Sequence, residues 1–173
     1  MIQPHGADRL RPLFIENRDE RETLLREAAE LPALILNSAA AANAVMLGAG
    51  YFTPLEGFMN LSDTLSVSEH MQTEEGLFWP VPCINRANNI SAIEGASKIA
   101  LLDPNIKGNP VLAIQDIDKI ESISDSQLSQ VTEQIFGTLD PQHPGVDTFS
   151  GLGKYLISGP IKVLNFSYFE ISR

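Results

Sequence analysis

The stretch from Gly48 to Met59 constrains this chain most, because it combines turn residues with large apolar side chains. Its glycines permit backbone angles that a Cβ atom forbids, and Pro54 fixes φ in the middle. The large hydrophobes are Tyr51, Phe52, Leu55, Phe58 and Met59. These are too many for a solvated loop. We therefore predict an ordered connection between two helices that turns sharply and packs into the core.

Length and composition bound the fold and the location. The chain has 173 residues, of which 43% are hydrophobic and 20% charged, so one globular domain over 1–173 is expected. No apolar run approaches the ~20 residues that cross a bilayer, and the N-terminus lacks the pattern of a secretory signal, so no membrane partner is expected. The lone Cys83 cannot form an internal disulfide, which together with the missing signal predicts a cytoplasmic location.

The charge balance argues against nucleic acid as a partner. Lysine and arginine number 12 against 22 aspartates and glutamates, a formal net charge of -10. A nucleic-acid binder commonly neutralises ~6–10 phosphates with cations on one face. Here the N-terminal arginines are interleaved with carboxylates, and the other basic residues are scattered singly.

Hydrophobic spacing and capping residues predict the order of the elements. The expected helices run from Asp19 to Leu31, from Ser38 to about Leu47, from Asn60 or Ser62 to Met71, and from Ser124 to Phe136. The expected strands cover 33–36, 77–84, 98–102 and 110–114, the last continuing toward 120, followed by a hairpin over 154–169 with its turn at 158–160. Two prolines in the 77–84 strand place it at an edge or a bulge. The pattern predicts an α+β fold with about six or seven mostly antiparallel strands and about three or four helices.

The histidines are the first candidates for chemistry. None stands at the spacing of a metal-ligand set, so His5 is interpreted as a structural residue that hydrogen-bonds an adjacent turn. His143 lies between Asp140 and Asp147 in a loop predicted over 138–151, and a carboxylate can orient an imidazole for acid–base work. No nucleophile or phosphate-binding residue stands nearby in sequence, which favours a structural or domain-docking role.

Three further patterns receive structural interpretations. Asp116, Asp118 and Glu121 alternate with isoleucines at a period of two, which is typical of the solvated face of a strand rather than of a metal site. Cys83 has no adjacent lysine or histidine and is expected to be a small buried hydrophobe. The glycines at 48 and 50 follow a helix instead of leading into one, which disfavours a phosphate-binding loop.

A family resemblance rests on segments spread along almost the whole chain. They are Pro4 to Gly6, Gly48 to Met59, Phe78 to Pro82, Phe136 to Val146 and Ser158 to Asn165. These segments resemble the N-terminal domain of the ATP sulfurylase (sulfate adenylyltransferase) family. Within that family, Asn43 to Met46 and Asn165 to Phe169 look most like the enzymes of sulfur-oxidising bacteria.

The resemblance implies a PUA-like β pseudobarrel with flanking helices, belonging to an enzyme that converts ATP and sulfate to adenosine 5′-phosphosulfate and pyrophosphate. Mg²⁺ accompanies ATP in the parent enzyme, and no cofactor is expected in this chain. The family's catalytic motif, Gln-x-Arg-Asn-Pro-x-His-x-x-His, does not occur in this sequence. The chain is therefore expected to be inactive alone, with no catalytic, substrate-binding or metal residue of its own.

The expected partner is a catalytic domain that would follow the C-terminus, and association into a homo-oligomer is left open. His143, Phe166 and Tyr168 are the candidates for docking against that domain. Two other functions also remain open. One is a free-standing PUA-like binding module for RNA or a small anion, and the other is an assembly domain that dimerises through the aromatic C-terminal strand.

Overall fold

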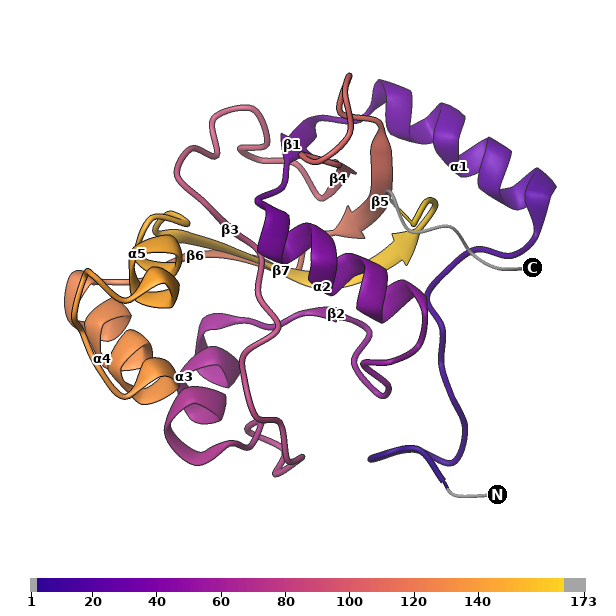
Figure 1. Cartoon of the computed structure of the whole chain (residues 1–173). Coiled ribbons are helices and arrows are strands. Elements are labelled where there is room, and N and C mark those ends of the chain that lie inside the picture. The colour runs from indigo at the N-terminus through magenta and orange to yellow at the C-terminus, as the bar shows by residue number, and fades with distance from the viewer. Residues whose placement is uncertain (1–2, 167–173) are drawn as a thin grey trace.

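The computed structural model describes residues 3–166. The elements are α1 (Arg18–Glu30), β1 (Ala33–Ile35), α2 (Ser38–Gly48), β2 (Gly57–Phe58), α3 (Leu61–His70), β3 (Arg86–Ala87), β4 (Lys98–Leu102), β5 (Val111–Asp116), β6 (Lys119–Ser122), α4 (Asp125–Phe136), α5 (Pro144–Ser150) and β7 (Tyr155–Val163). Figure 1 shows the helices arranged around a mixed, curled sheet. The predicted α+β class is confirmed.

The long strand β7 organises this sheet. It pairs antiparallel with β2, β3, β5 and β6, and the main path of the sheet runs β1-β4-β5-β7-β2. The pair of β1 with β4 is parallel, whereas β4 and β5 form the predicted antiparallel hairpin. The sheet is therefore mostly antiparallel, as expected.

The predicted hairpin with a turn at 158–160 is wrong, because β7 runs through this position without turning. Ser158 is buried, and Gly159 adopts φ 136° where other backbone segments come very close. The Cα partners of Gly159 and Pro160 are Phe58 and Gly57 of β2. A Gly-Pro pair, which usually marks a turn, here allows close approach of strands.

The predicted strand over 77–84 is also wrong. This segment is irregular apart from an isolated bridge between Gln72 and Phe78, and regular pairing begins only at β3. Pro80 and Pro82 have no N–H to donate to a ladder, which explains the break. The predicted continuation of β5 toward Ile120 is likewise interrupted, since Ile117 and Asp118 separate β5 from β6.

The helix ends follow capping chemistry, with one correction. Asn60 caps α3, and Ser124 forms the predicted capping box with Gln127 at the start of α4. Asn37 rather than Ser38 caps α2, because its side chain accepts a hydrogen bond from Ala40 N at 2.8 Å.

The loop predicted over 138–151 contains α5, so the described residues form five helices instead of three or four.

Two apolar clusters hold the sheet and helices together. Alternate residues of β4 and β5 face opposite sides. On one side, Ala100 and Ile114 pack with Ala28 of α1. On the other side, Ile99, Leu101 and Ala113 belong to the larger core, which also contains buried residues of α2, α3, α4 and β7. No helix in the described part of the chain is long and apolar enough to cross a membrane.

Candidate functional site

His143, the residue that the sequence favoured for docking, is the N-cap of α5. Its Nδ1 accepts hydrogen bonds from the backbone N–H groups of Gly145 at 3.2 Å and Val146 at 3.4 Å. Its ring lies 5.5 Å from that of Phe136, between centroids. Because Nδ1 caps the first turn of α5, the geometry supports a structural role for this ring.

His5 also has a structural place, with a different partner from the one expected. Its Nε2 lies 2.8 Å from the carbonyl oxygen of Phe78, far along the chain, rather than bonding an adjacent turn. Its ring meets the ring of Phe78 edge-on at 6.1 Å and lies 6.4 Å from that of Trp79. The histidine thus fastens the N-terminal arm to the segment that follows α3.

Three of the segments that carry the family resemblance converge around this contact. Gly6 sits against the side chains of Leu77 and Pro54, so that a Cβ at position 6 would lie 2.6 Å and 3.3 Å from their nearest atoms. Phe52 packs edge-on against Trp79 at 5.5 Å. We call the place where residues 4–6, 52–54 and 77–82 meet the arm–loop junction. Sequence order alone does not bring these segments together.

The Gly48 to Met59 connection is ordered and packed, as predicted. Phe58 and Met59 are buried, and Phe52 and Leu55 are partly buried against the same core. Tyr51 is the exception, since its side chain is 74% exposed. The connection is therefore packed into the core through its other large hydrophobes, while Tyr51 faces solvent.

Arg86 is a buried cation that sequence reasoning counted among the scattered basic residues. Its side chain is only 3% exposed, and it donates from Nε to Gly153 O at 2.7 Å and from Nη1 to Phe149 O at 2.9 Å. Burial lowers its pKa to about 10, so it stays charged at neutral pH. The guanidinium also lies 4.8 Å from the centroid of the Phe149 ring. It therefore clamps the C-terminal end of α5, whose carbonyl groups carry partial negative charge.

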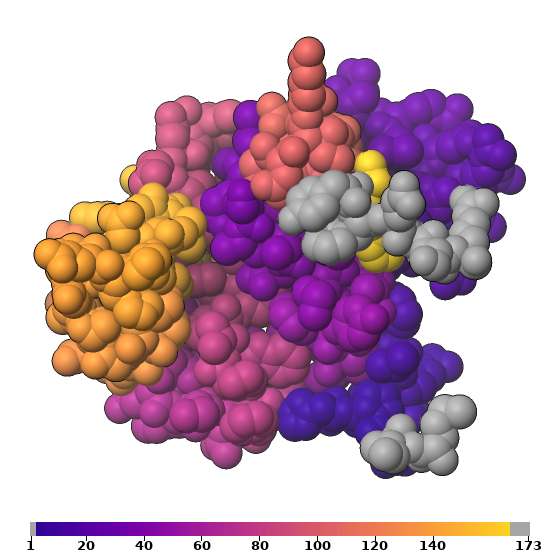
Figure 2. Space-filling view, viewed as in Figure 1, coloured from indigo at the N-terminus to yellow at the C-terminus, as the bar shows by residue number. Residues whose placement is uncertain are grey.

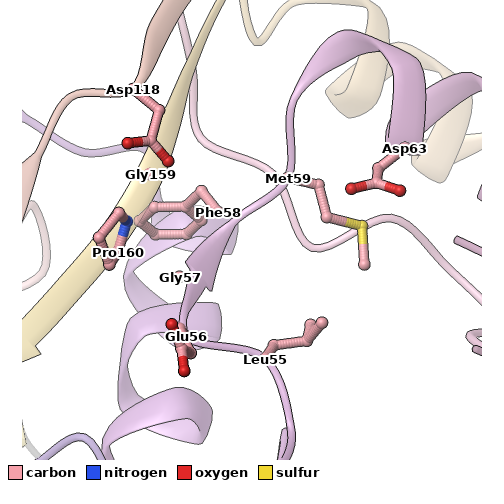
Figure 3. Close-up of a pocket in the computed structure, with 9 residues that line it drawn as sticks. All are labelled: Leu55, Glu56, Gly57, Phe58, Met59, Asp63, Asp118, Gly159 and Pro160. Atoms are coloured by element: carbon pink, nitrogen blue, oxygen red, sulfur yellow. The ribbon is translucent and has the colours of Figure 1, made fainter. Parts of the chain in front are cut away.

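A cavity of about 200 Å³ opens beside β2 and the start of α3 (Figure 3). Its lining includes the carboxylates of Glu56, Asp63 and Asp118 together with apolar side chains such as Phe58 and Met59, and no basic residue. An anionic ligand would meet repulsion there. Within residues 3–166, no group of three or more His, Cys, Asp or Glu side chains is placed to hold a metal ion.

Two of the lysines are neutralised by carboxylates. Lys98 Nζ lies 2.9 Å from Glu27 Oε1, a contact that raises the pKa of the lysine, and Lys154 Nζ lies 2.6 Å from Asp125 Oδ1. Together with Arg86, which donates to backbone carbonyls, these two lysines are thus engaged by groups of the protein itself. The geometry thus supports structural roles for His5 and His143.

The fold defines a small α+β domain built on a mixed, mostly antiparallel sheet. The sequence profile of a family described as "PUA-like domain" matches residues 2–166. The chain belongs to this PUA-like domain family.

Relatives and a solved structure extend this comparison. The chain is 54% identical over 170 residues to "Sulfate adenylyltransferase" of Allochromatium vinosum, 52% over 169 residues to the protein of that name from Alcanivorax borkumensis, and 44% over 171 residues to that of the Riftia pachyptila sulfur-oxidizing endosymbiont. Each match covers 98% of this chain but 43%, 42% and 38% of the respective relative, so the chain spans about two fifths of their length.

A chain of the structure titled "Hexameric APS kinase from Thiobacillus denitrificans" shares the fold. The TM-score is 0.67 at 22% identity, and the superposition covers 98% of this chain and 28% of that one. At this identity the likeness concerns the fold alone.

Proposed function

We propose that this chain is the N-terminal PUA-like domain of a sulfate adenylyltransferase. In the parent enzyme, ATP and sulfate would form adenosine 5′-phosphosulfate and pyrophosphate, and this domain would serve as the scaffold for a catalytic domain outside the chain. The observation that carries the proposal is the identity of 44–54% over 98% of the chain to relatives of that name. Their greater length supports a role as one domain of a larger enzyme.

The charges of the described residues favour a scaffold over a catalytic role. Transfer of an adenylyl group requires cations and hydrogen-bond donors that converge on the developing phosphate charge. Here the cavity is lined by carboxylates, Arg86 donates to backbone carbonyls, and the Nδ1 atom of His143 caps a helix. None of these groups is placed to stabilise a phosphate. Mg²⁺ and ATP would accordingly bind in the catalytic part of the parent enzyme.

The docking roles of His143, Phe166 and Tyr168 stay predictions. Phe166 packs on Phe14 of the N-terminal arm, with ring centroids 4.4 Å apart, so it would reach a partner only through its remaining partly exposed surface. Tyr168 lies outside the described residues. Association into a homo-oligomer and a cytoplasmic location also stay predictions.

The test is ATP formation from adenosine 5′-phosphosulfate and pyrophosphate with Mg²⁺. The chain alone at high concentration should give no turnover above background. Adding the part of the Allochromatium relative that lies outside the match, expressed as a separate chain, should raise the turnover of that part. Turnover by the chain alone would refute the scaffold role. A parallel titration with single-stranded RNA at low salt tests the alternative of a binding module, and we expect no binding.

A further inference from the structure

Three large apolar side chains stand half exposed on the loop that connects α3 to β3. Met71 is 54% exposed, Phe78 is 52% exposed and Val81 is 51% exposed. A hydrogen bond from Trp79 N to Met71 O at 2.8 Å and the bridge between Gln72 and Phe78 hold the start of this loop against its middle. We call the exposed parts of Met71, Phe78 and Val81 the 71–81 surface. Sequence reasoning missed it because residues 77–84 were expected to form a strand and Met71 was expected to end a helix.

The 71–81 surface belongs to the arm–loop junction and is built on fixed backbone. Beneath it, Trp79 is buried against Phe52, and His5 bonds the Phe78 carbonyl. Figure 2 shows the magenta-pink loop and the indigo N-terminal arm as adjoining parts of the molecular surface. Prolines on both sides of Val81 restrict the backbone further. A partner would therefore have little of this loop to order on binding.

We propose that the 71–81 surface is where the remainder of the parent enzyme packs against this domain. The inference rests on the proposed function and names the surface that the scaffold would use. The hydrogen bond from Trp79 N to Met71 O and the bridge between Gln72 and Phe78 bring the backbone of these residues together. Apolar side chains exposed near one another mark interaction surfaces, and phenylalanine and methionine are enriched at the buried centres of interfaces. More than half of the length of each of the two relatives that share over 50% identity has no counterpart in this chain.

The charge around this surface favours that occupant over a second copy of the chain. Glu74 and Glu75 are exposed on the same loop, and Glu69 is exposed at the end of α3. Two copies, each with a formal net charge of -10, would bring acidic rims together. A partner surface complementary to this one would have an apolar centre and a rim of lysine or arginine. Binding should therefore weaken as salt is added.

A fluorescent label provides a direct test of docking. The Val81→Cys variant places a thiol on the surface, while the native Cys83 is only 2% exposed and stays unlabelled. An environment-sensitive fluorophore on this thiol should shift to the blue, with saturation, when the part of the Allochromatium relative outside the match is added. The matched control is Leu139→Cys, whose side chain is 47% exposed between α4 and α5. It should show no shift.

Affinity measurements provide the second test. The double variant Met71→Ser with Phe78→Ser should bind the same probe at least about tenfold more weakly, because apolar anchors at an interface centre dominate binding. The control Ile35→Ser, at a side chain that is 55% exposed on β1, should bind within about twofold of the unaltered chain. Circular dichroism and thermal melts establish that each variant remains folded.

The outcomes separate this inference from the proposed function. If the unaltered chain neither binds the probe nor raises its turnover, both fail. If it binds but the double variant binds equally well and the Val81→Cys label does not respond, the inference is overturned and the proposed function stands. If the label shifts with concentration of this chain alone, the occupant is a second copy, which also overturns the inference.

Discussion

A single methyl group at position 159 should destabilise this protein strongly. Gly159 adopts φ 136° in the middle of β7, and a Cβ atom there would lie 2.1 Å from the carbonyl oxygen of Asp116 and 2.9 Å from the backbone nitrogen of Asp118. Ordinary contacts of a Cβ begin at 3.4 Å. Gly159→Ala therefore requires β7 and the β5–β6 connection to move apart by more than an ångström. The movement would strain the hydrogen bond from Asp118 N to Ser158 O, which is 2.9 Å long.

Three contributions set the size of the effect. A positive φ in a region reserved for glycine costs about 1–3 kcal/mol for alanine. Crowding in a packed interior adds about 1–3 kcal/mol, and the weakened backbone hydrogen bond adds about 1 kcal/mol. The free energy of unfolding should fall by about 3–7 kcal/mol. For a chain of this size the melting temperature would drop by roughly 6–28 °C.

Gly108→Ala is the matched control. Gly108 has φ 87°, but no atom lies within 4 Å of a Cβ built there, so only the conformational cost of about 1–3 kcal/mol applies. Urea titrations followed by circular dichroism, with thermal melts, would compare both variants with the unaltered chain. The close approach of strands at β7 would be refuted if the two alanines lowered the free energy of unfolding equally. That result would instead fit an exposed turn at 158–160.

Other substitutions test the remaining parts of the argument. Arg86→Met leaves the carbonyls of Phe149 and Gly153 without their donor. The free energy of unfolding, measured in urea titrations, should fall by about 2–4 kcal/mol. An unchanged unfolding midpoint would contradict the proposed role of Arg86 in holding the end of α5. His143→Ala should lower the free energy of unfolding by about 1 kcal/mol in the same titrations, whereas His143→Asn, whose side chain can also cap a helix, should lower it less. Equal decreases for the two variants would argue against capping by His143. Burial raises the pKa of the Cys83 thiol from 9.0 to about 12. As the pH rises, the thiol therefore loses its proton in the unfolded chain before it does so in the folded chain. The thiol's contribution to stability is complete below pH 9 and is lost between pH 9 and 12. Stability measured against pH should fall less steeply for Cys83→Ala over that interval, and parallel curves would contradict the burial.

Short-range chemistry made much of the fold predictable. The capping box at Ser124 and the glycine at 137 delimit α4 through contacts that reach only three or four residues. The β4–β5 hairpin follows from two apolar runs separated by a turn-rich loop. Cys83, which has no lysine or histidine beside it in the sequence, is buried as predicted. The α+β class was predictable for the same reason, because it follows from the order of locally recognisable helices and strands. The family was recognisable because the segments that resemble it are spread along nearly the whole sequence.

Long-range packing decided what the sequence left open or misplaced. Gly159 and Pro160 carry the composition of a turn, yet neighbouring strands press on their backbone and keep β7 extended. The cost of burying Arg86 is offset by hydrogen bonds to carbonyls more than sixty residues away in the chain. No local sequence pattern predicts these contacts. The N-terminal arm, the Gly48 to Met59 connection and the 71–81 loop meet only because the core fixes all three.

For the candidate site, too, some features follow from the sequence and others from tertiary packing. The sequence was sufficient to establish the family resemblance, the absence of the catalytic motif and the acidic charge, because each is a property of residue identity or order. The tertiary structure decided that His143 caps a helix and that Met71, Phe78 and Val81 stay half exposed on a fixed loop. Whether an apolar side chain is buried depends on which distant segments cover it, and that is settled only when the whole chain has packed.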